Sequence, residues 1–186
     1  AVPVGIGAMA AVLGLDDETI VSLCDEASTI GIAEPVNFNS PGQVVIAGHA
    51  TAVSQAVAYA KEHGARRAIL LPVSVPSHSS LMRKAGESLA ETLDATDFRA
   101  PEITVISAAT AEPYFDAADV RDKLSLQVYS PVLWVRAVKA MIAGGASSII
   151  ECGPGKVLAG LVRRIDKNTP VGFIENNDSL QKALQS

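Results

Sequence analysis

The sequence has 186 residues, of which 48% are hydrophobic, and a formal net charge of −5 at neutral pH. It can bury a core as one domain or two small ones, and no apolar run reaches the roughly 18 to 20 residues of a membrane span. The negative charge argues against nucleic acid as a partner, and two distant cysteines without a signal-peptide pattern favour the cytoplasm.

The first 75 residues follow a strand and helix pattern. Residues 68–75 are apolar and rich in β-branched side chains, which is typical of a strand buried on both faces, and the strand itself is predicted at 68–73. Cys24 shares the inward face of the first helix and is predicted to be a core residue. The order is that of a ferredoxin-like βαββαβ unit. The predicted elements are a strand at 7–13, a helix capped by Asp16, a hairpin of strands 36–39 and 43–47 around Pro41-Gly42, a helix at 51–63, and the strand at 68–73.

Beyond residue 75, helices and strands alternate. This alternation predicts parallel strands covered by helices. The fold class is therefore α/β, with a domain boundary near residue 75. The expected elements are helices at 79–94, 117–128, 130–143 (Ser130 as cap, Pro131 first) and 156–166, and strands at 103–107, 148–152 and 171–174.

A histidine lies where the strand at 68–73 gives way to the next helix. Pro76 ends the apolar run, and Ser77, Ser79 and Ser80 offer hydroxyls as helix caps after or beside His78. The positive end of a helix disfavours imidazolium, so His78 is predicted to be neutral and able to act as a base. The alternative is that His78 only caps the helix or packs at the strand edge.

Three separated motifs carry a family resemblance. They are Val36-Asn37-Phe38-Asn39-Ser40-Pro41-Gly42-Gln43, Val75-Pro76-Ser77-His78 with Leu81-Met82, and Glu151-Cys152-Gly153-Pro154-Gly155-Lys156. In this order they resemble the malonyl-CoA:acyl carrier protein transacylases of fatty-acid synthesis, over nearly the whole chain. The resemblance implies an α/β-hydrolase-like domain with an inserted ferredoxin-like subdomain. Residues 1–75 would form that subdomain, and 76–186 the C-terminal part of the larger domain.

The family's catalytic serine lies in a Gly-His-Ser-x-Gly segment, with an oxyanion-hole glutamine and a carboxylate-binding arginine. None of these motifs occurs here, so the chain is expected to be a C-terminal part whose N-terminal part, with the serine, is missing. The isolated segment is expected to expose apolar strand edges and to aggregate or unfold in part. The intact enzyme is expected to be a monomer.

The resemblance implies roles for five residues. His78 would take the proton of the serine, and the main-chain carbonyl of Gln127, in Gln127-Val128-Tyr129-Ser130-Pro131-Val132-Leu133-Trp134, would orient its ring. Asn37 and Asn39 alternate on one strand and would face the substrate, unless they bond their own backbone in the turn. Ser77, small and next to the base, is compatible with a malonyl group.

The implied partners are malonyl-CoA and the acidic acyl carrier protein, and no cofactor is expected. A cationic rim that attracts the carrier would consist of Arg66, Arg67, Arg83 and Lys84. The alternative for these four is a set of solvated surface charges.

Two rival functions remain open. One is a non-catalytic carrier- or ligand-binding α/β protein, and the other is a hydrolase with Cys152 as nucleophile and His78 as base. Against the latter, Cys152 is expected to be a buried thiol at a strand end. Ser40 is rejected as a nucleophile because it lies in a hairpin, Gly153-Pro154-Gly155-Lys156 lacks phosphate-loop spacing, and no metal-ligand cluster is predicted.

Overall fold

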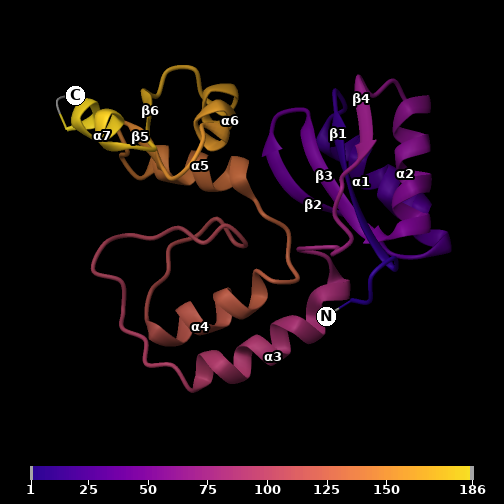
Figure 1. Cartoon of the computed structure of the whole chain (residues 1–186), viewed down its shortest axis with the longest axis horizontal. Coiled ribbons are helices and arrows are strands. Elements are labelled where there is room, and N and C mark those ends of the chain that lie inside the picture. The colour runs from indigo at the N-terminus through magenta and orange to yellow at the C-terminus, as the bar shows by residue number, and fades with distance from the viewer. Residues whose placement is uncertain (1, 185–186) are drawn as a thin grey trace.

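The computed structural model describes residues 2–184, which form a mixed α/β structure in two parts (Figure 1). None of its helices within that range combines the length and apolar composition needed to cross a membrane. The first part, called the four-stranded unit, contains β1 (Gly7–Leu13), α1 (Asp17–Ala27), η1 (Ser28–Ile30), β2 (Ala33–Ser40), β3 (Gln43–His49), α2 (Ala50–Glu62) and β4 (Arg67–Leu70). The C-terminal region, residues 76–184, contains η2 (Ser80–Met82), α3 (Arg83–Asp94), α4 (Ala117–Leu126), α5 (Trp134–Ala143), β5 (Ile149–Cys152), α6 (Val157–Ile165), β6 (Val171–Ile174) and α7 (Asn177–Ala183).

The four-stranded unit is an antiparallel sheet covered by α1 and α2. The strand order is β2-β3-β1-β4, and each neighbouring pair is antiparallel. Strand residues alternate between the two faces, so one set of apolar side chains from β1 and β3 packs against the inward faces of the two helices. This cluster holds the main core, which includes Val12, Ile20, Leu23, Ile46 and Val53.

Local signals in the sequence explain why this unit is well predicted. The Asp16 carboxylate accepts a hydrogen bond from the Thr19 N–H (2.7 Å), which caps α1 as expected. Gly42 has φ +69°, as the third residue of the predicted type II turn requires. The hairpin and both helices therefore form at the predicted places.

The prediction for β4 was wrong in two respects. The strand ends at Leu70, and it is not buried on both faces, because Ile69, Leu70, Val73 and Val75 are exposed. The physical reason is the strand order, which puts β4 at the edge of the sheet. The apolar, β-branched run at 68–75 thus forms an edge strand, β4, followed by an extended connection.

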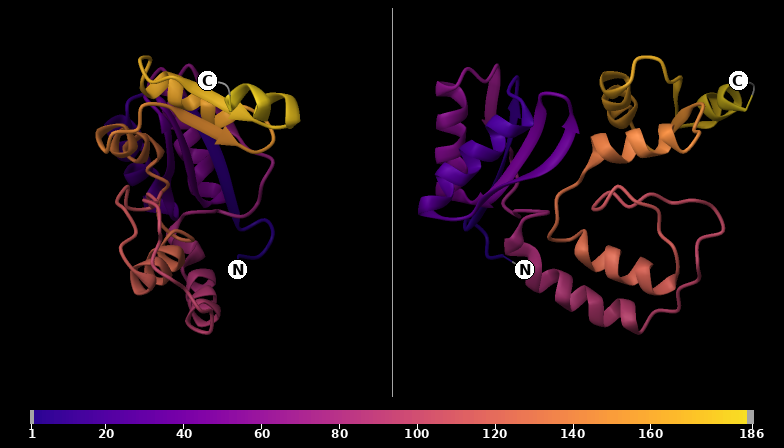
Figure 2. Two further views of the ribbon diagram at one scale, coloured as in Figure 1. Left: turned by 90° about the vertical axis from the view of Figure 1, so that its left-hand side faces the viewer. Right: turned by 180° about the vertical axis from the view of Figure 1, so that it is seen from behind.

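The C-terminal region is more open (Figures 1 and 2). Helices α3 and α4 lie side by side, a long irregular segment joins them, and α5 leads to the parallel pair β5–β6 with α6 and α7. The predicted parallel pairing of these two strands is confirmed. The prediction of a strand at 103–107 is wrong, since among residues 2–184 that segment forms a single isolated bridge, between Ile106 and Pro113.

Two helices of this region differ from expectation. The helix predicted to begin at Pro131 begins at Trp134, because Val132 instead bonds to the backbone of β2. Helix α7 was not predicted, although Asn176 forms a capping box with Ser179 at its start. The hydrogen bonds between Val132 and the main chain of β2 thus prevent α5 from starting at the local Ser-Pro signal.

Candidate active site

His78 lies in a strained turn between β4 and α3. Its φ is +66°, a left-handed conformation that non-glycine residues rarely adopt. Ser79, which is buried, closes the turn with hydrogen bonds from its hydroxyl (2.6 Å) and its N–H (3.3 Å) to the Pro76 carbonyl. The His78 N–H donates to the Val128 carbonyl (3.2 Å). The surrounding chain thus holds the histidine in an unfavourable backbone conformation.

The imidazole of His78 contacts the main chain of Gln127. Its Nδ1 lies 2.8 Å from the Gln127 carbonyl oxygen. A carbonyl oxygen only accepts hydrogen bonds, so Nδ1 carries the proton in this contact. In the neutral ring, Nε2 is then unprotonated and able to accept a proton. The structure therefore brings together the two residues named for general-base chemistry, in the tautomer that a base needs.

Gln127 reaches this position because α4 ends beside the first turns of α3. The Ser125 hydroxyl donates to the Gly86 carbonyl (3.0 Å), which ties the two helices together. A side chain at Gly86 would collide with the Tyr129 ring. Gln127 is the C-cap of α4, and the carbonyls at a helix end lack partners within the helix. The Gln127 carbonyl is thus free to accept from His78.

A pocket of about 310 Å³ opens beside His78, and all the residues that line it belong to the C-terminal region. One wall is Val132, whose N–H donates to the Val36 carbonyl (2.8 Å) and whose carbonyl accepts from the Phe38 N–H (3.0 Å). This segment therefore extends the four-stranded unit past β2 and anchors the site to it. The pocket is lined by His78, Ala108, Ala109, Gln127, Val128, Ser130, Pro131 and Val132.

The three residues predicted to contact the substrate lie near this wall, but Asn39 departs from the predicted strand alternation. Asn37 forms a bridge with Val132 and is half-buried. Asn39 falls in a register shift between Phe38 and Ser40, so the simple alternation that predicted a face shared with Asn37 is interrupted. Ser77 directly precedes His78 and is half-buried.

Ser79 and Ser80 do not cap the helix as predicted, and the contacts of Ser80 involve a residue that the sequence did not indicate. Ser79 makes no side-chain cap, and Ser80 bonds through its N–H and its hydroxyl to the carboxylate of Glu34 on β2 (2.7 Å each). A contact between residues 46 positions apart leaves no signal in a single sequence.

The cysteines and Ser40 do not join His78. Cys24 is buried as predicted, and burial, with smaller contributions from the Asp25 and Glu34 charges, raises the pKa of its thiol to about 12. Cys152 is exposed, contrary to the prediction of a buried thiol, and it lines a different pocket from His78. Ser40 is buried in the hairpin. Within residues 2–184, no cluster of histidine, cysteine and acidic side chains is arranged to hold a metal ion.

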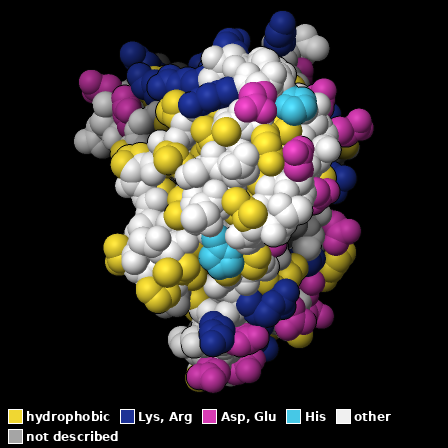
Figure 3. Space-filling view, turned by 90° about the vertical axis from the view of Figure 1, so that its right-hand side faces the viewer, with side chains coloured by type: hydrophobic (Ala, Val, Ile, Leu, Met, Phe, Trp, Pro, Cys, Tyr) yellow, Lys and Arg dark blue, Asp and Glu magenta, His cyan; other side chains and the backbone are white. Residues whose placement is uncertain are grey.

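The four basic residues named for carrier binding form two groups. Arg66 and Arg67 lie at the start of β4, whereas Arg83 and Lys84 open α3 at the other end of the four-stranded unit (Figure 1). On the face in Figure 3, Lys and Arg side chains gather along the upper margin and again near the lower end. The Arg83 guanidinium also stacks on the Tyr129 ring at 4.6 Å. These residues therefore do not form one continuous rim around His78.

One further arginine lies on the Arg67 side. The Arg164 guanidinium on α6 donates to the Gln43 side-chain oxygen (2.6 Å). Gln43 lies opposite Leu13, and Leu13 lies opposite Arg67, so these residues line the same end of the sheet. No pattern in the sequence indicated that these residues lie close together.

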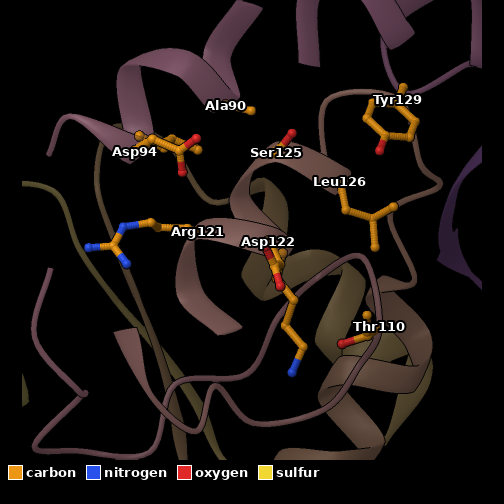
Figure 4. A pocket seen from close by; sticks show the side chains of 10 residues that line it. Ala90, Asp94, Thr110, Arg121, Asp122, Ser125, Leu126 and Tyr129 are labelled. Carbon is orange, nitrogen blue, oxygen red and sulfur yellow. The ribbon is translucent and has the colours of Figure 1, made fainter. Parts of the chain in front are cut away.

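A second pocket, of about 500 Å³, lies between α3 and α4 (Figure 4). Asp94 comes from α3, and Arg121 and Asp122 come from α4. Its serine, Ser125, already donates to Gly86, and its lining contains no histidine or cysteine. The pairing of a histidine with a main-chain acceptor, as at His78, therefore has no counterpart in this pocket.

The family profile for an acyl transferase domain matches residues 3–177. Over 185 residues the chain is 45% identical to the malonyl CoA-acyl carrier protein transacylase of Escherichia coli strain K12, and this match covers 100% of the chain and 60% of that protein. The chain thus spans about 60% of the length of this relative.

Solved structures agree in fold. The acyl-carrier-protein S-malonyltransferase from Burkholderia pseudomallei 1710b matches with a TM-score of 0.97 at 48% identity, over 100% of this chain and 60% of that one. A structure described as a type II PKS acyl-carrier protein in complex with its malonyl-transacylase matches with a TM-score of 0.96 at 41% identity, over 99% and 60% of the two chains.

Proposed function

Because this chain belongs to the acyl transferase domain family, we propose that the protein containing it is a malonyl-CoA:acyl carrier protein transacylase of fatty-acid biosynthesis. It moves a malonyl group from coenzyme A to the phosphopantetheine thiol of the carrier, through an ester on a serine. That serine lies outside residues 1–186. The relatives and solved structures that match the chain carry this activity in their names, which supports the proposal.

The observation that carries the proposal is the contact between His78 Nδ1 and the Gln127 carbonyl. It fixes the tautomer in which Nε2 accepts a proton. Nε2 takes the proton of the serine hydroxyl as its oxygen attacks the malonyl thioester carbonyl, and the C–S bond then breaks. The sulfur of coenzyme A leaves with the proton from the imidazolium.

The second half-reaction runs the same steps with the carrier. His78 Nε2 takes the proton of the phosphopantetheine thiol, and the sulfur attacks the malonyl ester. The serine oxygen then leaves and takes the proton back. A carbonyl dipole at Nδ1 stabilises imidazolium less than a carboxylate does, which suits transfer between thioesters of similar energy.

The substrate side of the site consists of Asn37, Asn39 and Ser77. The bridge between Asn37 and Val132 puts Asn37 at the edge of the His78 pocket, where its amide is suited to bonding an acyl or pantetheine group. Ser77 leaves room next to the base for the small malonyl group.

The finer fold assignment belongs to the same proposal. Residues 1–75 are a ferredoxin-like subdomain, which the strand order β2-β3-β1-β4 supports. Residues 76–186 are part of an α/β-hydrolase-like domain, which the parallel pair β5–β6 with its helices supports. We place the protein in the cytoplasm as a monomer.

The experiment that tests the function is acylation of the full-length protein with malonyl-CoA. Intact mass should show one malonyl group per chain, peptide mapping should place it on the upstream serine, and carrier protein with its phosphopantetheine arm should remove it. An adduct on Cys152 or Ser40, or no adduct, contradicts the proposal.

We expect Arg66 and Arg67 to serve the carrier and not the chemistry. The variant Arg66→Glu/Arg67→Glu should raise the apparent KM for the carrier by about tenfold or more and flatten its salt dependence. Hydrolysis of malonyl-CoA should change less than about twofold. Steady-state kinetics at several salt concentrations measures both effects.

The control for this prediction is Arg136→Glu/Lys139→Glu, which makes the same charge change at two exposed positions of α5. The pair Arg83→Glu/Lys84→Glu tests the other basic group. Equal loss of carrier transfer and malonyl-CoA hydrolysis in the Arg66 and Arg67 variant would assign these residues a structural role.

The rival functions have less support. A binding protein without chemistry has no need for a histidine held at φ +66° with its ring fixed by a main-chain carbonyl. The hydrolase with Cys152 needs the thiol beside His78, and the two residues line different pockets.

A further inference from the structure

Glu34 links the four-stranded unit to the turn that carries His78. Both of its carboxylate oxygens are occupied by one residue: Oε2 accepts from the Ser80 N–H and Oε1 from the Ser80 hydroxyl, at 2.7 Å each. Glu34 is half-buried on β2. Such two-point contacts of a charged acceptor fix orientation as well as distance.

Ser80 is the first residue of η2, which runs directly into α3. The first N–H groups of a helix need acceptors from outside it. The preceding residue, Ser79, does not supply one, because its hydroxyl donates back to the Pro76 carbonyl. Glu34 therefore caps this helix start from another strand.

The contact falls on the C-terminal side of the strained histidine. On the N-terminal side, Pro76 is fully buried and packs where Gly7 has no side chain. Two residues after His78, the Glu34 carboxylate holds Ser80. A residue at φ +66° persists only when the chain around it is fixed, and Glu34 fixes the side that the local turn leaves free.

No ion pair accounts for the placement of Glu34 among the described residues. Within residues 2–184, the salt bridges are Lys123 with Asp119 and Lys156 with Glu175, and neither involves Glu34. Its charge is met by the two donors of Ser80. Partial burial of a carboxylate without a cation costs free energy that an apolar side chain at the same place would not. Its placement therefore indicates a role in holding Ser80.

We propose that Glu34 is a positioning residue for His78: by clamping Ser80, it holds the histidine turn so that Nδ1 stays on the Gln127 carbonyl and Nε2 faces the reacting proton. This inference rests on the proposed function, because it assigns His78 the role of base. Glu34 itself touches neither the His78 ring nor, in this proposal, the substrate.

The kinetic test uses the full-length protein and four variants. Glu34→Ala should lower kcat for malonyl transfer by roughly ten- to a hundredfold, because small displacements of a base are costly, with KM for malonyl-CoA within about twofold. Glu34→Gln keeps an acceptor and a donor for Ser80, and it should restore kcat to within about threefold of wild type. Ser80→Ala should fall between these two, and Glu62→Ala, at the exposed end of α2, is the matched control.

The double variant Glu34→Ala/Ser80→Ala separates the clamp from two independent effects. If loss of the Glu34–Ser80 contact causes the slower transfer, the double variant should be no slower than Glu34→Ala, because both substitutions remove the same contact. Additive losses would overturn the proposal. So would Glu34→Gln as slow as Glu34→Ala, or Glu34→Ala within about twofold of wild type.

A spectroscopic test does not depend on activity. The proton on His78 Nδ1 should give a slowly exchanging NMR signal in the wild type and in Glu62→Ala, and it should be lost to exchange in Glu34→Ala while the signals of β1 and β3 persist. An unchanged signal in Glu34→Ala would overturn the inference. If the wild type transfers no malonyl group, the proposed function fails, whereas the Nδ1 signal still decides whether Glu34 positions the ring.

Discussion

Replacing His78 with alanine is expected to slow acylation of the upstream serine by roughly a hundredfold to ten-thousandfold in the full-length protein. The substitution removes Nε2, the group proposed to accept the serine proton in the first half-reaction and the thiol proton in the second. Both half-reactions should therefore fall together. Quench-flow detection of the malonyl-enzyme and discharge onto the carrier measure them separately.

The fold should survive this substitution. His78 is half-buried, and alanine at this position meets a similar cost of the left-handed backbone, since both residues have a Cβ. A thermal midpoint close to that of the wild type is thus expected. Malonyl-enzyme formation near the wild-type rate in His78→Ala would remove the base from the proposed mechanism.

Gln127→Ala is the matched control for this prediction. His78 bonds to the main-chain oxygen of Gln127, and alanine leaves that oxygen in place. We expect Gln127→Ala to retain activity within about threefold of wild type. A loss as large as that of His78→Ala would mean that the Gln127 side chain, and not its carbonyl, does the orienting.

The four-stranded unit was predictable because its signals are local. Asp16 lies three residues before the Thr19 N–H that it caps, and Pro41-Gly42 specifies its own turn. The alternating apolar residues of β1 and β3 find their partners across a hairpin and an adjacent strand. Short-range chemistry and tertiary packing favour the same structure here.

The errors arise where a segment depends on a distant partner. The run at 103–107 has strand composition, yet in the described part of the chain only Pro113 bridges it. Ser130-Pro131 is a good helix start, yet two backbone bonds from Val132 to β2 delay the helix to Trp134. Propensity in a single sequence does not say which backbone groups already have partners.

The site was predictable only in part for the same reason. The histidine position before a helix suggested a base, but its contact with Gln127 came from the family resemblance, because 49 residues separate them. Glu34 left no signal at all, since a lone glutamate beside Pro35 in a strand resembles any surface charge. The two arginine groups are separated because β4 runs from Arg67 toward the His78 turn, which leaves Arg66 and Arg67 at the far end of the strand.

The two parts of the chain are expected to differ strongly in local stability. In the 186-residue chain by itself, amides of β1, β3 and α2 should exchange with solvent at least about a hundredfold more slowly than those of β5 and β6. Both hydrophobic clusters of the described residues belong to the four-stranded unit and the connection after it. Hydrogen exchange followed by NMR or by mass spectrometry of peptides measures the difference.

The contrast follows from how β5 and β6 are covered. Parallel strands are normally buried on both faces, and a pair of strands alone is marginal in water. Here Ile150 on β5 is 42% exposed, and Val157, where α6 begins, is 70% exposed. Their apolar surfaces contribute little to stability until something covers them.

The full-length protein supplies the comparison that decides the cause. If further parts of the protein cover β5 and β6, their protection there should rise toward that of β1 and β3, while α2, already packed on its own sheet, should change little. The amide of Ala159, which donates to the Glu151 carboxylate (2.7 Å), reports on the α6 end of this pair. Equal protection of the two parts in the 186-residue chain would mean that the C-terminal region is stable without such cover, and that the exposed apolar residues around β5 have another role.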